Sequence, residues 1–523
     1  MRIFLSGPMG AGKTTVAREL ASLARLRVVD LDERVEARAG ARVAEIVRTR
    51  GEREFRRLER EEARQLAEES GLVVALGGGT VVDDAVRRLL LSRGTLVMLD
   101  ASLEVLVARV RDGSERPLLG NDPRQALEAI LDARRDAYAE CHARIDTSNA
   151  TPRDVAVRVL EVARGAPIAV PLGRRSYVVE VGAGVRARVG ARALSGSAGE
   201  LVVVVTDGGA SRWAADAETS LRASGRRVAR VELARGEQHK RLAAVERVWD
   251  AALEAGADRD SLVLAVGGGV VGDVAGLAAS TLLRGVAFAA LPTTLLAMVD
   301  SSVGGKTGID HARGKNLVGT FHQPSFVLCD PDVLQTLDPA ELRSGLAEVV
   351  KAAWIEGEQD VRALEADAEA LVRADPAAIE RAVRRAVATK ARIVCADERE
   401  QGARRLLNLG HTVAHALEAE AGYGKLRHGD AVALGMVAAF RVGLALGRGE
   451  PADAARATAL LEALGLPVDL AGRVTEGVLA WISQDKKRAG NTVRFVVGGP
   501  PGRIEVVQVP IERLGSLIAQ GVP

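Results

Sequence analysis

A short segment near the start of the chain has residue types and spacing that predict phosphate chemistry. Residues 7–15 read GPMGAGKTT, so four residues separate Gly7 from Gly12, and Lys13 and Thr14 follow directly. In a phosphate-binding loop of this spacing, backbone N–H groups surround a phosphate, the lysine reaches the β- and γ-phosphates, and the hydroxyl holds Mg²⁺. The run RIFLS before the segment is strand-like and the run after it is helical, which is the context that such a loop needs. We therefore expect ATP with Mg²⁺ here, bound by Gly10, Gly12, Lys13, Thr14 and Thr15.

A second glycine-rich segment lies about 260 residues later. Residues 266–273 read VGGGVVGD, in which Gly267, Gly269 and Gly272 form G-x-G-x-x-G between a strand-like and a helical run. The acidic residue that would bind a ribose about 20 residues further on is missing, because that span reads LRGVAFAALPTTL. The motif alone therefore leaves open whether the segment binds a dinucleotide in another way or not at all.

Three of the seven histidines fall close together, at positions 411, 415 and 428. Spacing alone favours His411 and His415 as metal ligands, since residues four apart share one face of a helix, as in zinc peptidases. The glutamate of that motif is absent, because the segment reads HTVAH. A histidine on a helix is more often structural than a ligand, so the spacing leaves this site open.

Lysine is rare in this chain and is concentrated in motifs. The 71 basic residues include only nine lysines, and the other 62 are arginine. A lysine retained in such a composition indicates a position that needs a compact, titratable ammonium group rather than a planar guanidinium. These positions are Lys13, Lys240, Lys306, Lys315, Lys351, Lys390, Lys425, Lys486 and Lys487.

Composition excludes several classes of protein. A net charge of +2 with 3% aromatic residues argues against nucleic-acid binding. No stretch approaches 18 uncharged apolar residues, which argues against a membrane partner. The three scattered cysteines favour a reducing compartment over a disulfide framework. We expect a cytoplasmic protein.

The elements that would position these residues fall into three regions. Residues 1–164 alternate short apolar runs with charged helical stretches, which predicts an α/β domain with a parallel sheet. The charged run at 51–70 is interpreted mostly as a solvated helix face. After the Pro- and Gly-containing seam GAPIAVPLG, residues 165–333 predict a second, Rossmann-like α/β domain, and residues 334–523 predict an all-helical domain.

Further polar segments in the first region narrow the function. The segment VVDLD ends the second predicted strand and supplies Asp30 and Asp32. The segments GEREFRRLE and ERPLL supply Arg56 and Arg116, and the glycines of LGGGT allow the backbone to approach a ligand closely. With the phosphate-binding loop, this set makes residues 1–164 similar to the shikimate kinase family. The resemblance implies that Arg116 lies over the ATP phosphates and that Asp30 lies near Mg²⁺. It also implies a shikimate site at Asp32, Arg56, Gly77, Gly78, Gly79 and Arg134.

One of these positions departs from the family pattern. The proline that the family has between the arginine and Tyr138 is absent from the segment RRDAY at 134–138. Arg135 is therefore an alternative to Arg134 in the predicted site.

The remainder of the chain, from about residue 168, resembles the 3-dehydroquinate synthase family. The segments that carry the resemblance are LPTTLLAMVDSSVGGKTGIDHARGKNLVGTFHQP (291–324), GLAEVVKAAW, LLNLGHTVAHALE, RHGDAVALGM and DKKRAG. The resemblance implies NAD and a divalent metal, Zn²⁺ or Co²⁺, as cofactors. It also implies conversion of 3-deoxy-D-arabino-heptulosonate 7-phosphate to 3-dehydroquinate and phosphate, with NAD consumed and regenerated, and we expect a homodimer through this half.

The resemblance also assigns residues to each ligand. The implied metal ligands are Glu348, His411 and His428, with His415 beside the substrate instead. NAD would contact Asp207, Glu237, Lys240, Gly268, Gly269, Asp273, Thr293, Thr294, Asp300, Lys306 and Lys315. The substrate, an anion with a carboxylate and a phosphate, would contact Arg284, Lys306, Asn316, Lys351, Lys390, Arg404, Asn408, His415 and either Lys486 or Lys487.

Two other interpretations are compatible with parts of the pattern. Residues 168–523 could form a metal-dependent polyol dehydrogenase, although such an enzyme has no need of a lysine-rich anion site. The N-terminal half could be a nucleotide-binding module without catalysis, although the intact set of Lys13, Thr14, Asp32, Arg56 and Arg116 argues against this. We therefore expect two small-molecule enzymes in one polypeptide.

Overall fold

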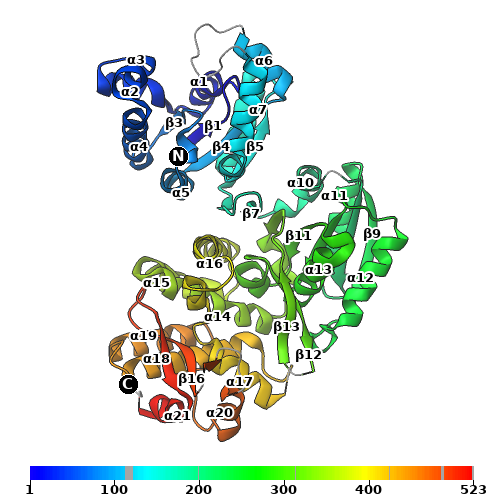
Figure 1. The fold of residues 1–523 in the computed structure, drawn as a ribbon. Coiled ribbons are helices and arrows are strands. Elements are labelled where there is room, and N and C mark those ends of the chain that lie inside the picture. The colour runs from blue at the N-terminus through cyan, green and yellow to red at the C-terminus, as the bar shows by residue number, and fades with distance from the viewer. Residues whose placement is uncertain are drawn as a thin grey trace. The chain divides into compact units, whose positions relative to one another are not determined.

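The chain divides into two compact units, residues 1–178 and 179–523, which are described here separately (Figure 1). The computed structural model describes residues 1–111, 122–197, 199–312, 314–422, 424–483, 488–489 and 491–520. None of the helices in this described part is both long enough and apolar enough to span a membrane.

The first unit is a five-stranded sheet covered by helices. Its strands are all parallel and lie in the order β2-β3-β1-β4-β5. The elements in chain order are β1 (Arg2–Ser6), α1 (Lys13–Ala24), β2 (Arg27–Asp30), α2 (Leu31–Ala39), α3 (Val43–Arg50), α4 (Glu52–Glu68), β3 (Leu72–Ala75), η1 (Thr80–Val82), α5 (Asp84–Arg93), β4 (Thr95–Asp100), α6 (Leu103–Arg111), α7 (Pro123–Ala133), α8 (Arg135–Ala139), β5 (Ala143–Asp146), α9 (Pro152–Gly165) and β6 (Ile168–Val170).

Side-chain alternation along the strands builds a core on each face of this sheet. Ile3 and Leu5 of β1 pack with residues of α1 and α9, whereas Phe4 packs with α4 and α5 on the opposite face. Because parallel strands end at the same edge, the loops after β1, β2 and β3 meet there. These loops carry the phosphate-binding segment, Asp32 and the three glycines 77–79.

The second unit contains another sheet, with its strands in the order β7-β14-β11-β10-β8-β9, and the pairs β14-β11, β11-β10, β10-β8 and β8-β9 are parallel. A two-stranded antiparallel ribbon, β12-β13, stands apart from it. The elements are β7 (Tyr177–Val181), η2 (Val185–Arg188), α10 (Val189–Gly196), β8 (Leu201–Asp207), α11 (Ser211–Ala223), β9 (Arg227–Leu233), η3 (Glu237–His239), α12 (Leu242–Glu254), β10 (Leu262–Gly267), α13 (Gly269–Thr281), η4 (Leu282–Arg284), β11 (Ala287–Pro292), η5 (Ala297–Ser301), β12 (Lys306–His311), β13 (Gly314–Phe321) and β14 (Phe326–Cys329).

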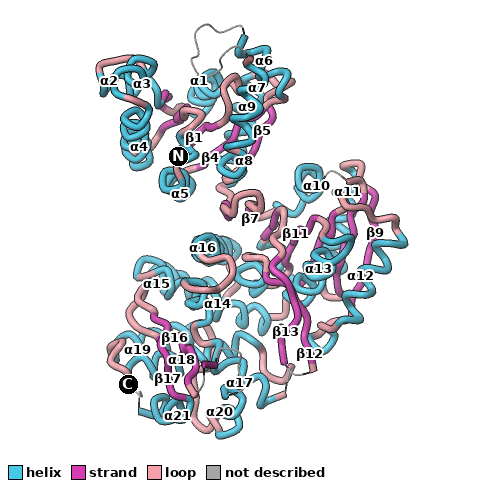
Figure 2. Tube along the Cα trace, in the orientation of Figure 1, coloured by secondary structure: helices cyan, strands magenta, loops and turns pink. Residues whose placement is uncertain are grey.

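The rest of the second unit is mostly helical, as predicted (Figure 2). It also contains a small antiparallel sheet, β15-β16-β17, which the prediction of an all-helical domain did not include. The elements are η6 (Pro331–Thr336), α14 (Pro339–Glu356), α15 (Glu358–Val372), α16 (Pro376–Ala396), η7 (Ala403–Asn408), α17 (His411–Ala421), α18 (His428–Ala445), α19 (Pro451–Ala463), α20 (Glu476–Ser483), β15 (Arg488–Ala489), β16 (Thr492–Val497), β17 (Glu505–Pro510) and α21 (Ile511–Gln520).

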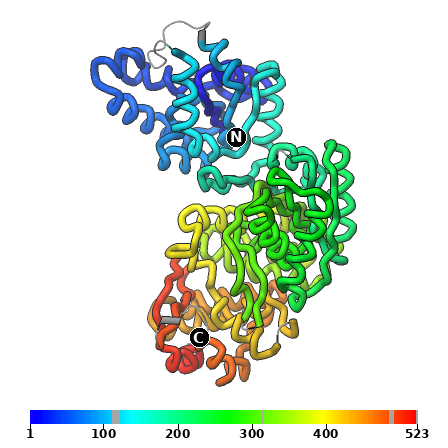
Figure 3. Tube along the Cα trace, turned by 45° about the vertical axis from the view of Figure 1, so that its right-hand side comes forward, coloured from blue at the N-terminus to red at the C-terminus, as the bar shows by residue number. Residues whose placement is uncertain are grey.

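This added sheet packs on the helices rather than on the parallel sheet. In Figures 1 and 3 the orange-to-red C-terminal segment lies beside α18, and β16 and α21 both contact that helix. The fully buried Trp354 of α14 donates its indole N–H to the carbonyl of Gly499, 2.8 Å away, in the turn between β16 and β17. The contact ties the C-terminal sheet to the helix that carries Glu348 and Lys351.

Candidate active sites

The phosphate-binding loop of the first unit has the backbone conformation that its glycines permit. Gly7, Gly10 and Gly12 have φ values of 145°, 83° and 86°, which residues with a Cβ rarely adopt. Lys13 Nζ donates to the carbonyls of Gly7 and Pro8, at 2.9 and 3.0 Å, so its ammonium lies over the loop. Gly10, Gly12, Lys13, Thr14 and Thr15 all line one cavity.

The same cavity brings in the two aspartates that follow β2. Thr14 Oγ1 donates to Asp30 Oδ2 at 2.9 Å, which puts a hydroxyl and a carboxylate together where Mg²⁺ is expected. Asp32, in the first turn of α2, also lines this cavity. Burial raises the pKa of Asp32 to about 6, and the neighbouring carboxylates Asp30 and Glu59 add to this effect.

The three glycines after β3 lie between Asp32 and two arginines. A Cβ on Gly77 would lie 3.2 Å from Asp32 Oδ1, and a Cβ on Gly79 would lie 2.6 Å from Arg56 Nη1. Arg134 Nη1 donates to the carbonyl of Gly78 at 2.6 Å. A Cβ at Gly77 or Gly79 would force these side chains to shift, so the absence of a Cβ permits their present positions. Residues Gly77, Gly78 and Gly79, which both arginines approach, are called the glycine wall here.

The structure separates the two alternative arginines. Arg134 lines a cavity together with Arg56 and Gly79, whereas Arg135 is exposed and pairs with Asp132 at 2.5 Å. Arg116 lies outside the described residues.

Glu59 is part of this arrangement, although sequence reasoning missed it. Its two carboxylate oxygens accept hydrogen bonds from Arg56 Nη1 at 2.8 Å and from Thr80 Oγ1 at 2.6 Å, and the residue is 2% exposed. The interpretation of this helix as mostly solvated is therefore wrong for the face that carries Glu59. A signal was present, because residues 55, 58, 59, 62, 63 and 66 fall on one stripe of the helix.

In the second unit, several predicted cofactor residues follow neighbouring strands. Asp207 ends β8, Gly268 and Gly269 follow β10, and Thr293 and Thr294 follow β11. These three strands are adjacent and parallel, so their carboxyl ends form one edge. This is where open α/β sheets bind their ligands. Gly268 caps α13 and Gly269 begins it, so the N-terminus of this helix carries no bulky side chain.

Two ion pairs join the remaining predicted cofactor residues. The buried Lys240 contacts Asp273 Oδ2 at 2.6 Å and donates to Asn316 Oδ1 at 2.5 Å. Lys315 Nζ lies 3.4 Å from Glu237 Oε1. These pairs connect α13, η3 and the ribbon.

Asp300 lies among buried lysines. Lys390 Nζ is 2.5 Å from Asp300 Oδ1, Lys351 Nζ is 3.8 Å from the same oxygen, and Lys351 also pairs with Glu348. Burial opposes ionisation of Asp300, but Lys390 and Lys351 outweigh it and hold the pKa of Asp300 well below its usual value. Burial lowers the pKa of Lys390 to about 8; Asp300 opposes that shift, whereas Lys351 adds to it.

A polar cavity of about 380 Å³ opens beside this cluster. Lys306 pairs with Glu400, and Asn408 Nδ2 donates to the other oxygen of Glu400 at 2.5 Å. Arg404 is buried and donates to the carbonyls of Glu398 and Gly304, at 2.5 and 2.9 Å. The described residues that line the cavity include Asp300, Lys306, Asn316, Lys390, Glu400 and Arg404.

Three potential metal ligands converge next to Lys351. Glu348, His411 and His428 each offer one donor atom, and these atoms lie within 4.8 Å of one another. His411 directs Nδ1 to the carbonyl of Leu409 at 3.2 Å, which leaves Nε2 facing Glu348 Oε1 at 3.3 Å. Two imidazoles and a carboxylate with further positions open fit a catalytic Zn²⁺ or Co²⁺ site.

Two carboxylates beside His428 favour a cation there, whereas the ammonium of Lys351, which pairs with Glu348, opposes one. Burial disfavours a charged imidazole, but Glu348 and Glu418 outweigh it and raise the pKa of His428 to about 10. His415 is exposed, although its ring centroid lies 5.5 Å from that of His411. Among the described residues, the group of three donor atoms that lie within 4.8 Å of one another is that of Glu348, His411 and His428, and His415 does not belong to it.

Several predicted substrate residues are not among those that line this cavity, including Lys351, Asn408 and His415. Arg284 is exposed on η4 and is not among the residues that line it. Lys486 and Lys487 lie outside the described residues. Conversely, Glu400 and Glu418 were missed, since each is separated from its lysine partner by more than 90 residues in sequence.

Comparisons with known proteins agree with both halves. A family model for shikimate kinase matches residues 9–164, and models for the N- and C-terminal parts of 3-dehydroquinate synthase match residues 230–344 and 345–488. The 3-dehydroquinate synthase of Pelobacter propionicus is 44% identical over 352 residues, which are 67% of this chain and 98% of the relative. That of Rhodospirillum rubrum is 47% identical over 346 residues, which are 64% and 89%.

A solved structure extends the comparison to the fold. The 2-epi-5-epi-valiolone synthase of Streptomyces hygroscopicus, with NAD⁺ and Zn²⁺ bound, has a TM-score of 0.59 at 29% identity and covers 66% of this chain and 96% of its own. The chain belongs to the 3-dehydroquinate synthase family, and it carries a shikimate kinase domain on the N-terminal side of the synthase in the same polypeptide.

Proposed function

We propose that this chain catalyses two reactions of the shikimate pathway. The first unit transfers the γ-phosphoryl group of ATP to the 3-hydroxyl of shikimate. The second converts 3-deoxy-D-arabino-heptulosonate 7-phosphate to 3-dehydroquinate and phosphate. The kinase proposal rests chiefly on Asp32, which lies between the phosphate-binding loop and the glycine wall with its arginines.

The kinase residues divide the work of phosphoryl transfer. Lys13 neutralises charge on the β- and γ-phosphates, and Arg56 and Arg134 bind the carboxylate of shikimate as planar donors. The 3-hydroxyl oxygen forms a bond to the γ-phosphorus as the bond to the β–γ bridging oxygen breaks. Asp32 accepts the hydroxyl proton. We assign Mg²⁺ to Thr14 and Asp30, the phosphates also to Gly10, Gly12, Thr15 and Arg116, and the shikimate ring to Gly77, Gly78 and Gly79.

The synthase proposal rests on the lysine cluster beside the three-ligand set. Lys351, Lys390 and Asn316 hold the carboxylate and ring hydroxyls, and Lys306, Arg404 and Asn408 hold the phosphate. A bound NAD would exchange a hydride with the substrate, and a bound Zn²⁺ or Co²⁺ would acidify its hydroxyl. His415, Arg284 and Lys486 or Lys487 complete the proposed phosphate contacts.

We assign the cofactors to residues of the second unit alone. Glu348, His411 and His428 would hold the metal. NAD would lie along the strand edge, against Asp207, Glu237, Lys240, Gly268, Gly269, Asp273, Thr293, Thr294, Asp300, Lys306 and Lys315. The related valiolone synthase, which was solved with NAD⁺ and Zn²⁺ bound, supports this pair of cofactors.

A direct assay separates this function from a polyol dehydrogenase. The purified chain, given NAD, Zn²⁺ and the heptulosonate phosphate, should release phosphate without accumulating NADH, because the hydride returns to the substrate. A dehydrogenase would instead accumulate NADH in proportion to product. The same protein, given MgATP and shikimate, should form shikimate 3-phosphate, which a module that only binds nucleotide would not.

Three further expectations stay predictions. They are the domain limits 1–164, 165–333 and 334–523, a homodimer through the synthase half, and a location in the cytoplasm. Size-exclusion chromatography with light scattering would test the dimer.

A further inference from the structure

The chain that follows the last kinase helix is part of the first unit. Residues 172–176, here called the linker turn, lie before the unit boundary at Val178 and form a compact turn. Leu172 N donates to Ser176 Oγ at 2.9 Å, and Ser176 Oγ donates to the carbonyl of Gly173 at 2.6 Å. Gly173 has a φ of 62°, so a residue with a Cβ would be strained there.

The linker turn is hydrogen-bonded to Glu140, the residue that directly follows α8. Gly173 N donates to Glu140 Oε1 at 2.9 Å, and Glu140 is 8% exposed. A second contact, from Arg174 Nε to Asp136 Oδ1 at 2.8 Å, joins two exposed side chains and contributes little. The hydrogen bond to the buried carboxylate is therefore the stronger of these two contacts between the turn and the α8 region.

The other oxygen of Glu140 leads towards the glycine wall. Arg87 Nε donates to Glu140 Oε2 at 2.5 Å, and Arg87 Nη1 donates to the carbonyl of Val81 at 2.6 Å. Val81 belongs to η1, the turn that directly follows the glycines 77–79. Both Arg87 and Glu140 are buried, so solvent screens this ion pair only weakly.

Helix α8 also bonds directly to the glycines 77–79. Tyr138 Oη donates to the carbonyl of Gly78 at 2.7 Å, and Arg134, which caps the helix, donates to the same oxygen. A helix of five residues has little stability of its own, so its position depends on what holds its ends. Arg134 at its N-terminus and Tyr138 near its C-terminus both bond the carbonyl of Gly78, and Glu140 directly follows its last residue.

We propose that Glu140 and the linker turn position Arg134 and the glycine wall for shikimate binding. The proposal rests on the kinase function proposed above and extends it, since it makes the segment leading to the synthase a working part of the kinase. Glu140 is a positioning residue and touches no substrate. Charge-assisted hydrogen bonds at both of its oxygens restrain α8, and a misplaced binding group weakens binding even when it is distant from the reacting atoms.

The test uses the full chain with four variants: Ser176→Ala, Glu140→Gln, the double variant, and the control Ser92→Ala, an exposed serine of α5 in the same unit. Steady-state kinetics would give kcat and the KM values for shikimate and for ATP. Ser176→Ala should raise KM for shikimate about fivefold, the factor that an ordinary neutral hydrogen bond is worth. KM for ATP and both synthase constants should stay unchanged, as should every constant of Ser92→Ala.

The double variant tests whether the two groups act together. Its KM for shikimate should not exceed that of Glu140→Gln alone, because the linker turn affects shikimate binding only by way of the Glu140 carboxylate. If Glu140→Gln fails to fold, Ser176→Ala still decides the matter.

Two outcomes would overturn the inference. One is a lowered melting temperature of Ser176→Ala with an unchanged KM for shikimate, and the other is an equal rise in KM for both substrates. Failure of the unsubstituted chain to phosphorylate shikimate would instead refute the proposed kinase function.

Discussion

Asp32 has the environment of a proton acceptor that works near neutral pH. Its pKa of about 6 is above the ordinary carboxyl value because burial and nearby carboxylates disfavour the charge. A raised pKa means that the carboxylate is protonated below about pH 6 and ionised above it. A base of this kind is more effective than an ordinary aspartate at neutral pH.

The kinase reaction should therefore lose activity in acid. We expect kcat/KM for shikimate to fall tenfold per pH unit below about pH 6 and to level off above it. Asp32→Asn, which cannot accept the proton, should lower kcat by roughly 10²–10⁴-fold at pH 7.5. The profile should be measured with MgATP saturating. A profile that stays level down to pH 5 would show that another group takes the proton.

The histidines of the second unit offer a prediction that separates geometry from spacing. His428→Ala removes one of three proposed ligands, and it should weaken Zn²⁺ binding by more than about 100-fold, since even losing a partner of a ligand costs 10- to 100-fold. Metal content after dialysis should fall well below one per chain, and synthase activity should be lost. His415→Ala should keep its metal and lose turnover instead. If His415→Ala lost its metal and His428→Ala kept it, the metal ligands would instead be His411 and His415, the pair spaced four residues apart.

Residue identities in the sites were partly predictable. The nine residues 7–15 contain every residue type of a phosphate-binding loop, so their spacing was sufficient to predict that this loop binds phosphate. Glu59, Glu400 and Glu418 were not predicted, because a buried carboxylate is recognisable only once its distant partner is known. The preference for Arg134 over Arg135 likewise depends on the direction of each side chain from a short helix.

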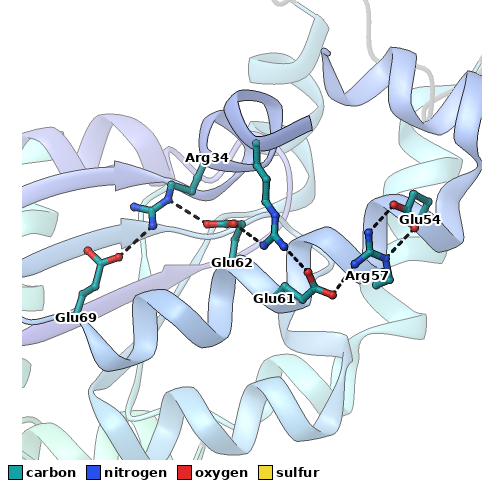
Figure 4. Close-up of polar contacts among 7 residues, drawn as sticks. Arg34, Glu54, Arg57, Glu61, Glu62 and Glu69 are labelled. Atoms are coloured by element: carbon teal, nitrogen blue, oxygen red, sulfur yellow. Dashed lines mark hydrogen bonds and ion pairs between the residues drawn. The ribbon is translucent and has the colours of Figure 1, made fainter. Parts of the chain in front are cut away.

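At the scale of elements, α2 and α4 are joined by a network of ion pairs (Figure 4). Glu62 of α4 lies at its centre, with its side chain 4% exposed. It accepts from Arg34 Nε at 3.0 Å and from Arg38 Nη1 at 2.8 Å. Because α2 carries Asp32 and α4 carries Arg56, the network fixes the two helices that contribute to the shikimate site.

Breaking the network should destabilise the kinase unit. Glu62→Gln removes the charge that two arginines share, and we expect the melting temperature of this unit to fall by roughly 3–8 °C. The control Glu54→Gln weakens the partly exposed pair with Arg57 at the outer end of the same network and should change the melting temperature by less than about 1 °C. Calorimetry of the full chain can identify the unfolding transition of the kinase unit, since MgATP and shikimate should raise the melting temperature of that transition. Equal shifts in both variants would mean that burial of Glu62 is unimportant.

The type and order of the helices and strands were more predictable from the sequence than the pairing of the strands. Apolar runs bounded by glycine indicated both parallel sheets, because a strand buried on two faces is apolar throughout. The sheet β15-β17 was missed, although residues 492–497 and 505–510 contain β-branched residues in short runs. Such strands resemble the apolar stripe of a buried helix, and only their pairing with each other distinguishes them.

At the scale of the whole molecule, each proposed site is built from one unit only. The kinase residues lie between Gly10 and Arg134, and the synthase residues lie between Asp207 and Lys487. No residue of one site contributes to the other, so the chemistry of each should be independent even though the linker turn belongs to the kinase.

Lys13→Ala tests this independence in the full chain. It removes the ammonium that lies over the phosphate-binding loop, so kinase kcat should fall by roughly 10²–10³-fold, as when another preorganised charge-stabilising group is lost. Synthase kcat and KM should stay within about twofold of the unsubstituted values, because the two proposed sites share no residues and substitutions without shared partners behave additively. His428→Ala is the reciprocal variant, and it should abolish phosphate release while shikimate phosphorylation persists. Coupled assays of both reactions on the same preparations give all four numbers. A joint loss of the two activities in either variant would mean that the units communicate, and that the two sites cannot be treated as separate enzymes.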